Sequence, residues 1–242
     1  MHCRIKGLVH QVVRAASAHA FALIISVVWF SLSASGAHAA SCTGDALVNV
    51  TLPSGAQWEL CWELRDEEGV VIKEAAYKTP QGSFRNVLKE ASLAQINVAY
   101  DDGTPSQRHV TDIANGGGLG LNIHSLSPLD CIDGSLHASA GNTVLCVKTK
   151  PRGYAYKSYA LLQQGHMLVL ESRATVGLSS YIIHWRLYDD GSIEPSVGLT
   201  GLLPKIGSDP NYGWPLDQNN RVGVAFNTSY FWRLDFDLAA DG

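Results

Sequence analysis

Apolar and polar residues alternate along short stretches of the chain. The alternation is regular from Trp58 to Leu64, and a period of two places successive side chains on opposite faces of a β-strand. No long stretch has an apolar period of 3.6 residues, so the pattern predicts an all-β fold, built as a sandwich or a barrel. Further extended runs are predicted at Val70–Ile72, Ser83–Leu88, Ala94–Tyr100, Val144–Val147, Met167–Leu170, Ser180–Leu187, Ser192–Leu199 and Gly223–Leu234.

The best-defined local unit is a predicted hairpin. Its two runs, Ser180–Leu187 and Ser192–Leu199, are joined through Asp189-Asp190-Gly191. Asp-Gly between two apolar runs is a strong hairpin signal, because the glycine accepts the positive φ that tight β-turns require. We therefore expect these two strands to be antiparallel neighbours.

Three other segments are predicted not to be strands. Asn115–Gly118 and Ser208–Gly213 are predicted loops, since adjacent glycines and a Pro/Asn/Gly cluster disfavour regular structure. Ser92–Gln95 is predicted as one helical turn. No repeat or linker interrupts residues 40–242, which are expected to form a single domain.

The first 39 residues have the composition of an export signal. Arg4, Lys6 and Arg14 occur without any acidic residue, an apolar core runs from Ala20 to Leu32, and residues 37–39 form a small-x-small cleavage site. A membrane anchor is the alternative, but the apolar core is short for a span of about 20 residues. We therefore expect cleavage after residue 39 and a periplasmic or secreted protein.

The charge of the mature chain excludes two classes of partner. The full sequence has 18 basic and 22 acidic residues, and removal of three basic residues with the signal leaves 15 − 22 = −7. An acidic chain without a run of Lys or Arg offers no electrostatic footprint for nucleic acid or for an anionic membrane. We expect neither as a partner once the signal is removed.

Four cysteines remain after the signal, namely Cys42, Cys61, Cys131 and Cys146. An even number in an exported chain without a Cys-x-x-Cys motif favours two disulfides over a thiolate metal site. The sequence allows three pairings. The nearest-neighbour pairing, Cys42 with Cys61 and Cys131 with Cys146, closes two short loops.

The amino-acid sequence of the hairpin region contains a distinctive motif. It resembles the segment of copper-dependent amine oxidases that carries their self-made topaquinone, with the frame Thr175, Gly177, Tyr181, Trp185, Asp190-Gly191, Ile193 and Thr200-Gly201. Weaker blocks follow the order of the same family at Trp58 and Trp62, Glu68–Ile72, Ser92–Ala94, Val98–Asp102, Gly118–Asn122, Asp130-Cys131 and Asn142–Cys146. The resemblance implies the antiparallel β-sandwich of the catalytic domain, and it implies the Cys131–Cys146 disulfide.

The resemblance also assigns candidate catalytic residues. Tyr100 matches the tyrosine that holds a quinone oxygen, and Asp112 is the candidate for the carboxylate base. Asp112 lies two residues closer to Tyr100 than is usual, so a solvated loop acid is the open alternative. Ser179 replaces the tyrosine that becomes the quinone, and a serine hydroxyl cannot be oxidised to one. Tyr181 could serve as a substitute precursor, but it matches the family's unmodified tyrosine.

The copper ligands are replaced as well. Arg233-Leu234-Asp235 sets the register of the strand that follows the family's His-x-His pair, and the two histidine positions become Phe226 and Thr228. Neither residue suits Cu(II), for which imidazole is the preferred ligand. The family's third histidine would lie downstream of Gly242, so no metal site is expected.

Two groups outside this frame are candidates for other chemistry. His184 could be combined with Ser179 and Asp112 as a hydrolytic triad, but Ser179 is not in a Gly-x-Ser-x-Gly elbow. Most tryptophans are expected in the core, whereas Tyr154–Tyr159 and Tyr212–Trp214 are expected to be exposed and are the first places to look for a ligand.

The sequence therefore predicts an exported copper amine oxidase-like protein without catalytic activity, which acts as a binding or structural module without a cofactor. The alternative is a primary-amine oxidase, with copper and topaquinone, completed by another chain or by an unusual cofactor precursor. An apolar strand at Phe226–Leu238 would leave an exposed edge, so a homodimer or a companion protein is expected.

Overall fold

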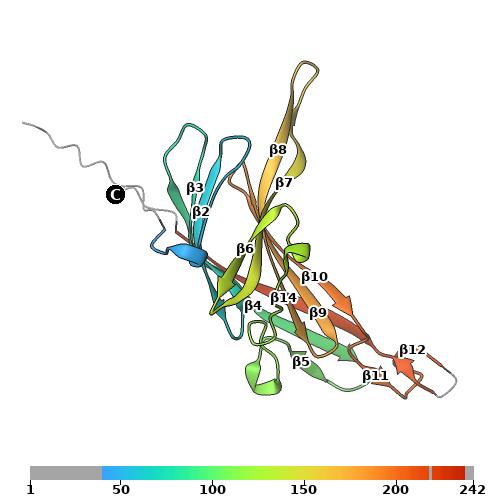
Figure 1. The fold of residues 1–242 in the computed structure, drawn as a ribbon. Helices are drawn as coiled ribbons and strands as arrows, with labels where there is room; N and C mark the ends of the chain where they lie inside the picture. Colours follow the sequence, from blue (N-terminus) through green and yellow to red (C-terminus); the bar gives the residue numbers. More distant parts are fainter. Residues whose placement is uncertain (1–39, 218–219, 238–242) are drawn as a thin grey trace, which may run out of the picture. The chain divides into compact units, whose positions relative to one another are not determined.

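Two antiparallel sheets share one hydrophobic core (Figure 1). The computed structural model describes residues 40–217 and 220–237. The predicted export signal, residues 1–39, lies outside the described residues. No α-helix occurs in the described part of the chain, and no helix there is long and apolar enough to cross a membrane. The prediction of an all-β antiparallel fold is confirmed.

The first sheet has the strand order β1-β2-β3-β4-β14, with β5 paired to the end of β4. Its strands are β1 (Leu47–Thr51), β2 (Gln57–Arg65), β3 (Gly69–Lys78), β4 (Arg85–Asp101), β5 (Gln107–His109) and β14 (Ala225–Phe236). Strand β4 is long enough to pair with β3 along its first half and with β5 along its second half. Strand β14 lies along the other side of β4 and forms an edge of the sheet.

The second sheet has the strand order β10-β9-β8-β7-β6. Its strands are β6 (Gly134–Ser139), β7 (Asn142–Lys157), β8 (Leu162–Val176), β9 (Ser179–Tyr188) and β10 (Ile193–Gly201). A small third sheet contains β11 (Ile206–Gly207), β13 (Val222–Gly223) and β12 (Trp214–Pro215). Three short 3₁₀ helices complete the described elements, η1 (Gly44–Ala46), η2 (Ile113–Asn115) and η3 (Pro128–Asp130).

The predicted hairpin is confirmed as β9 and β10. Strand β9 pairs with β10 from Leu187 opposite Ile193 to Ser179 opposite Gly201. Alternate residues of β9 are buried along its whole length, from Ser179 to Leu187. This period of two places Trp185 in the core, where its ring meets that of Trp232 at a centroid distance of 5.0 Å.

Two buried tryptophans of β2 donate hydrogen bonds to backbone carbonyls of other elements. Trp58 on β2 is fully buried, and its indole N–H donates to the carbonyl oxygen of Tyr188 on β9 at 2.9 Å. Trp62 donates to the carbonyl oxygen of Asp45 at 2.6 Å. The expectation that most tryptophans fill the core is confirmed for Trp58, Trp62 and Trp185.

The helical turn predicted at Ser92–Gln95 is wrong, because these residues lie within β4. The pairing of β4 with β14 passes from Leu93 opposite Trp232 to Gln95 opposite Phe231, which leaves Ala94 without a partner. This extra residue is a β-bulge, which interrupts the alternation of inward and outward side chains. The interruption of the pattern therefore reflects a bulge rather than a change to helix.

Both disulfides follow the nearest-neighbour pairing, Cys42 with Cys61 and Cys131 with Cys146. The first ties the start of the described chain to β2, and the second ties the segment after η3 to β7. Closing a loop of about 15 residues is worth about 3 kcal/mol in the chain-entropy model. Both links therefore hold connecting segments against the sandwich.

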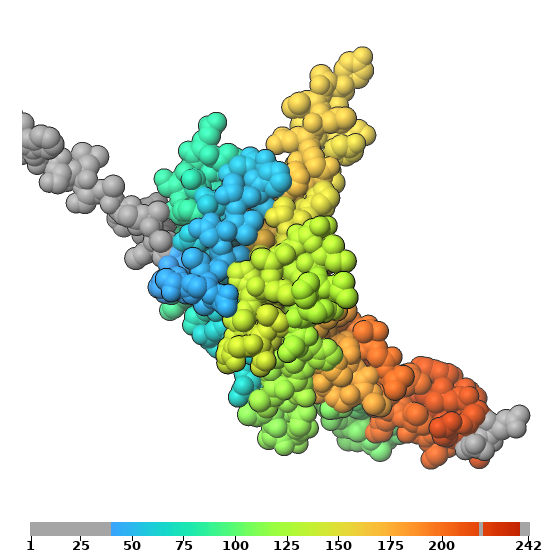
Figure 2. Space-filling view, viewed as in Figure 1, coloured from blue at the N-terminus to red at the C-terminus, as the bar shows by residue number. Residues whose placement is uncertain are grey.

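The aromatic segments expected at the surface are exposed. Tyr154, Tyr156 and Tyr159 lie on or beside the far end of the β7–β8 hairpin, which extends beyond its neighbours in Figure 2, coloured yellow. Tyr212 and Trp214 are exposed in and beside the loop before β12. These predictions of exposure are confirmed.

Candidate functional site

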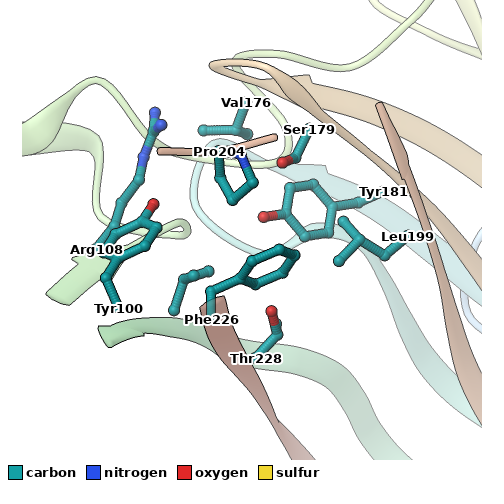
Figure 3. Close-up of a pocket in the computed structure, with 10 residues that line it drawn as sticks. Tyr100, Arg108, Val176, Ser179, Tyr181, Leu199, Pro204, Phe226 and Thr228 are labelled. Carbon is teal, nitrogen blue, oxygen red and sulfur yellow. The ribbon is translucent and has the colours of Figure 1, made fainter. Parts of the chain in front are cut away.

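A small cavity lies where the ends of several strands from both sheets meet (Figure 3). It brings together five of the positions singled out from the sequence, Tyr100, Ser179, Tyr181, Phe226 and Thr228. The complete lining consists of Val98, Tyr100, Arg108, Val176, Ser179, Tyr181, Leu199, Pro204, Phe226 and Thr228. These residues come from β4, β5, β8, β9, β10, β14 and the segment after β10.

Strand pairing explains why the residues of the first sheet converge. Phe226 on β14 is opposite Tyr100 on β4, and Thr228 is opposite Val98. Residues two apart on one strand share a face. All four side chains therefore border the cavity from one side.

The second sheet supplies the opposite wall. Ser179 is the first residue of β9, directly after the turn at Gly177 and Leu178, and it faces the core together with Tyr181. Gly177 has a φ of +65°, and a side chain there would collide with the Arg108 guanidinium. The positive φ of the turn is what favours glycine here, because the colliding atoms are the far end of the flexible Arg108 side chain, which can move aside.

Asp112 is not among the residues that line the cavity. It is the N-cap of η2, where its carboxylate accepts hydrogen bonds from the backbone N–H of Ala114 at 2.9 Å and from the side-chain amide of Asn115. These two hydrogen bonds give the Asp112 carboxylate a local structural role as a helix cap. Its assignment as the catalytic base remains a prediction that rests on the resemblance alone.

His184 lies on the opposite face of β9 from Ser179 and Tyr181, because it alternates with the buried residues. Its Nε2 is 3.4 Å from a carboxylate oxygen of Glu171, which also contacts Lys148 at 2.9 Å. The hydrogen bond from His184 is the main cause that lowers the pKa of Glu171. Ser179 and His184 therefore point to opposite faces of β9 and cannot act together on one substrate, so the structure excludes the hydrolytic triad.

The cavity contains polar groups whose bonding is incomplete. Arg108 is half-buried, and no hydrogen bond or ion pair joins it to another residue in the described ranges 40–217 and 220–237. The Thr228 hydroxyl is buried and has no hydrogen-bond partner within the same ranges. The interior has room for about one water molecule, at about 10 Å³.

Tyr181 is the most deeply buried phenol at the cavity, with 2% of its surface exposed. Burial raises its pKa to about 12, while a hydrogen bond with Ser179 and the charge of Arg108 act in the opposite direction. The ring is therefore neutral throughout the physiological range. Beside it, Lys205 contacts Asp102 and lies 5.2 Å from the centroid of the Tyr100 ring, which anchors the segment that carries Pro204.

The donor set of this cavity does not fit copper. Its polar groups are one guanidinium and the hydroxyls of serine, threonine and tyrosine, and no imidazole, thiolate or carboxylate lines it. Elsewhere in the described part of the chain, no group of three or more His, Cys, Asp and Glu side chains is arranged to hold a metal ion. Cu(II) in proteins is bound mainly through imidazole, so no step can be assigned to copper here.

Sequence reasoning missed Arg108, Pro204, Val176 and Leu199 as parts of this site. Arg108 lies on the short strand β5, and Pro204 lies in the irregular segment after β10. No local pattern distinguishes either residue from an ordinary surface residue. Only the packing of the two sheets brings them next to Ser179.

The family model "Copper amine oxidase, enzyme domain" matches residues 54–239. The chain is 27% identical over 228 residues to a primary amine oxidase of Arthrobacter sp., covering 79% of this chain and 35% of that protein. It is 26% identical over 216 residues to a primary amine oxidase of Pisum sativum, covering 76% and 32% respectively. The chain therefore spans about a third of the length of these curated relatives.

Solved structures show the same fold. A copper-containing benzylamine oxidase from Hansenula polymorpha superposes with a TM-score of 0.60 at 19% identity, covering 80% of this chain and 33% of that one. The lysyl oxidase of Pichia pastoris gives a TM-score of 0.59 at 16% identity, covering 76% and 28%. With the family model spanning most of its sequence, this chain belongs to the copper amine oxidase family.

Proposed function

We propose that this protein is an exported, catalytically silent member of the copper amine oxidase family that acts as a binding or structural module. The observation that supports this proposal is the identity of three residues that line the cavity. The resemblance assigns Ser179 to the position of the family's cofactor tyrosine, and Phe226 and Thr228 to those of two copper-binding histidines, and all three line the cavity. A serine cannot become a quinone, and neither of the other two residues replaces imidazole as a ligand of Cu(II).

Export is supported by the two disulfides. Such bonds persist in oxidising compartments and are rare in the cytosol. The composition of residues 1–39 supports the same location, because a basic start and an apolar core precede a small-x-small site. We therefore propose that the folded domain works in the periplasm or outside the cell.

A partner protein or a second copy is the proposed binding target. Strand β14 pairs with β4 on one side, and no strand in the described ranges pairs with its other side. Phe231 and Phe236 on this edge are 51% and 55% exposed. An unpaired apolar edge favours association with another chain.

Light scattering during size-exclusion chromatography tests this association. The wild type is expected to form a dimer or larger species at high concentration, and Phe231→Lys should shift it towards monomer. Tyr156→Lys is the matched control, since it places the same charge on an exposed aromatic position far from β14. A wild type that stays monomeric at high concentration, alone and with candidate partners, contradicts the proposal.

The second candidate function is a primary-amine oxidase completed by another chain. The observation that favours it is the position of Tyr181, a phenol that lines the cavity together with Tyr100 and Ser179. Oxidation of that ring would require copper ligands that the described lining does not supply. A second polypeptide would have to bring them.

Three measurements on one preparation separate the two functions. The protein is expressed with excess copper, and then analysed for bound metal, for quinone by a redox-cycling stain, and for hydrogen peroxide release from a panel of primary amines. The proposed function predicts a negative result in all three. Stoichiometric copper with a positive stain would contradict it, and loss of the stain in Tyr181→Phe would identify Tyr181 as the precursor.

A further inference from the structure

Glu59 on β2 is a buried carboxylate that has only neutral donors around it. The residue is 8% exposed. Its two oxygens accept hydrogen bonds from the side-chain amide of Asn49 at 2.6 Å and from the backbone N–H of Ala40 at 2.7 Å. No Lys, Arg or His forms an ion pair with it within residues 40–217 and 220–237. A buried carboxylate without a counter-charge is unfavourable, so a cation at one of these donor positions would stabilise the fold.

The segment that begins at Ala40 is held against β2 and β3 by three consecutive residues. Ala40 donates to the buried carboxylate on β2. The backbone N–H and the hydroxyl of Ser41 donate to Glu74 on β3 at 2.8 Å and 3.0 Å. Cys42 forms the disulfide with Cys61 on β2. The Ala40 nitrogen is therefore fixed in place by its neighbours as well as by its own hydrogen bond.

The disulfide sets the register of this segment along β2. Cys42 and Cys61 are 19 residues apart in the sequence, and so are Ala40 and Glu59. The segment therefore runs alongside β2 in the same direction. Glu59 and Cys61 share a face of their strand, because they are two residues apart. The Cys42–Cys61 bond thus holds the Ala40 nitrogen at the Glu59 carboxylate.

The predicted export signal ends one residue before this nitrogen. Hydrolysis of the peptide bond between residues 39 and 40 consumes one water molecule and leaves a carboxylate on residue 39 and an amino group on Ala40. An α-amino group has an ordinary pKa of about 8, so it is mainly protonated at neutral pH. Cleavage there would replace the neutral N–H donor, 2.7 Å from Glu59, with an ammonium.

We propose that removal of the export signal creates a buried ion pair between the α-ammonium of Ala40 and the carboxylate of Glu59. This inference rests on the export part of the proposed function, which supplies the signal peptidase that cleaves the bond. The new ammonium provides the counter-charge that Glu59 lacks. A charge-assisted hydrogen bond is about twice as strong as a neutral one. The mature domain is therefore more stable than the same domain with residues still attached before Ala40.

Export of the full chain into the periplasm of a bacterial host tests the cleavage. N-terminal sequencing and intact mass of the exported protein should give Ala40 as the first residue. A mature chain that begins at any other residue overturns the ion pair and leaves the proposed function intact. A chain that keeps its signal overturns both the ion pair and the proposed export, whereas the copper and quinone assays depend on neither.

Thermal unfolding of the exported protein tests the ion pair in a double-mutant cycle. A glycine inserted between residues 39 and 40 displaces the ammonium and leaves a neutral N–H on Ala40. The midpoint should then fall by about 3 °C at neutral pH. In Glu59→Gln the same insertion should lower it by less than about 1 °C, because the amide carries no charge. An equal fall in both backgrounds would show a steric effect and would overturn the ion pair.

Glu63→Gln is the matched control. Glu63 is an exposed glutamate on the same strand, and it pairs with Arg65. In this background the inserted glycine should still lower the midpoint by about 3 °C. A loss of the effect in Glu63→Gln as well as in Glu59→Gln would show a general dependence on charge and would overturn the assigned pair.

Acylation of the α-amino group provides a test that needs no substitution of Glu59. An N-hydroxysuccinimide ester reacts only with the unprotonated amine, and an ion pair keeps the amine protonated. At neutral pH, Ala40 of the mature chain should react about tenfold more slowly than the glycine of the extended chain. Equal rates would overturn the proposal.

Discussion

Arg65 and Arg108 are arginines of the same sheet with opposite surroundings. Arg65, at the end of β2, contacts Glu63 at 2.6 Å, Glu68 at 3.0 Å and Glu90 at 2.6 Å. Arg108, on β5, contacts no carboxylate in the described part of the chain and lines the cavity. The Arg65 guanidinium links neighbouring strands through ion pairs, whereas the Arg108 guanidinium has no ion pair within the described ranges.

The surroundings of Glu90 extend this contrast. Its carboxylate on β4 contacts Arg65 on β2, Lys73 on β3 at 3.2 Å, and Arg233 on β14. One acidic side chain thus connects four strands. The ion network on the outer face should therefore govern stability, whereas loss of the Arg108 charge should change it little.

The largest expected effect follows the loss of Arg65. Arg65→Gln should reduce the free energy of unfolding by about 2 kcal/mol at neutral pH, because three carboxylates lose their shared cation. Urea denaturation measures the change. Arg186→Gln, which breaks a more exposed pair with Glu194, should cost less than about 1 kcal/mol. Equal losses would mean that the network adds nothing beyond single pairs.

The dependence of the unfolding free energy on pH below neutral tests the same network. The hydrogen bond from Arg65 is the main cause that lowers the pKa of Glu90 from 4.5 to about 2. A depressed pKa in the folded state contributes stability that is present above about 4.5 and is lost as the pH falls towards about 2. Unfolding free energies of wild type and Glu90→Gln should therefore converge in this range. A constant difference would contradict the shifted pKa.

Thr228→Val should raise stability by about 1 kcal/mol. The substitution removes a buried hydroxyl that has no partner in the described ranges and keeps the shape of the side chain. Thr175→Val is the control, since the Thr175 hydroxyl pairs with that of Ser180 at 2.7 Å and its removal should lower stability. A loss of stability in both variants would show that the Thr228 hydroxyl is satisfied in solution.

The pH dependence of stability above pH 10 tests the burial of Tyr181. Burial raises its pKa to about 12 from 10.0, so its contribution to stability is present below pH 10 and is lost as the pH rises towards 12. Ultraviolet titration of the folded protein should show a late tyrosinate phase that Tyr181→Phe reduces. Tyr156→Phe, at an exposed position, should leave that phase unchanged. A late phase of equal size in Tyr181→Phe would assign it to another tyrosine.

The smallest expected effect on stability is that of Arg108→Gln. The free energy of unfolding should change by less than about 0.5 kcal/mol, because no described residue loses an ion pair. Urea denaturation beside Arg65→Gln gives the direct comparison. A loss as large as that of Arg65→Gln would show that the fold itself depends on the charge of Arg108.

Local patterns predicted most of the fold. The alternation around Trp58 and the Asp-Gly turn at Asp190-Gly191 predicted β2 and the β9–β10 hairpin, since both signals act over neighbouring residues. The pattern failed at Ser92–Gln95, where a bulge at Ala94 interrupts the pairing of β4 with β14. The partner strand is about 140 residues away in the sequence, so no local window contains the cause.

The sequence by itself predicted the all-β class and the family frame, and the resemblance assigned Ser179, Phe226 and Thr228 to the positions of the family's tyrosine and two histidines. Only the tertiary structure decided that these residues share one small cavity with Arg108 and that Asp112 caps η2. The physical reason is that cavities and unpaired charges arise where distant strands pack together, and that packing is not encoded in any single segment.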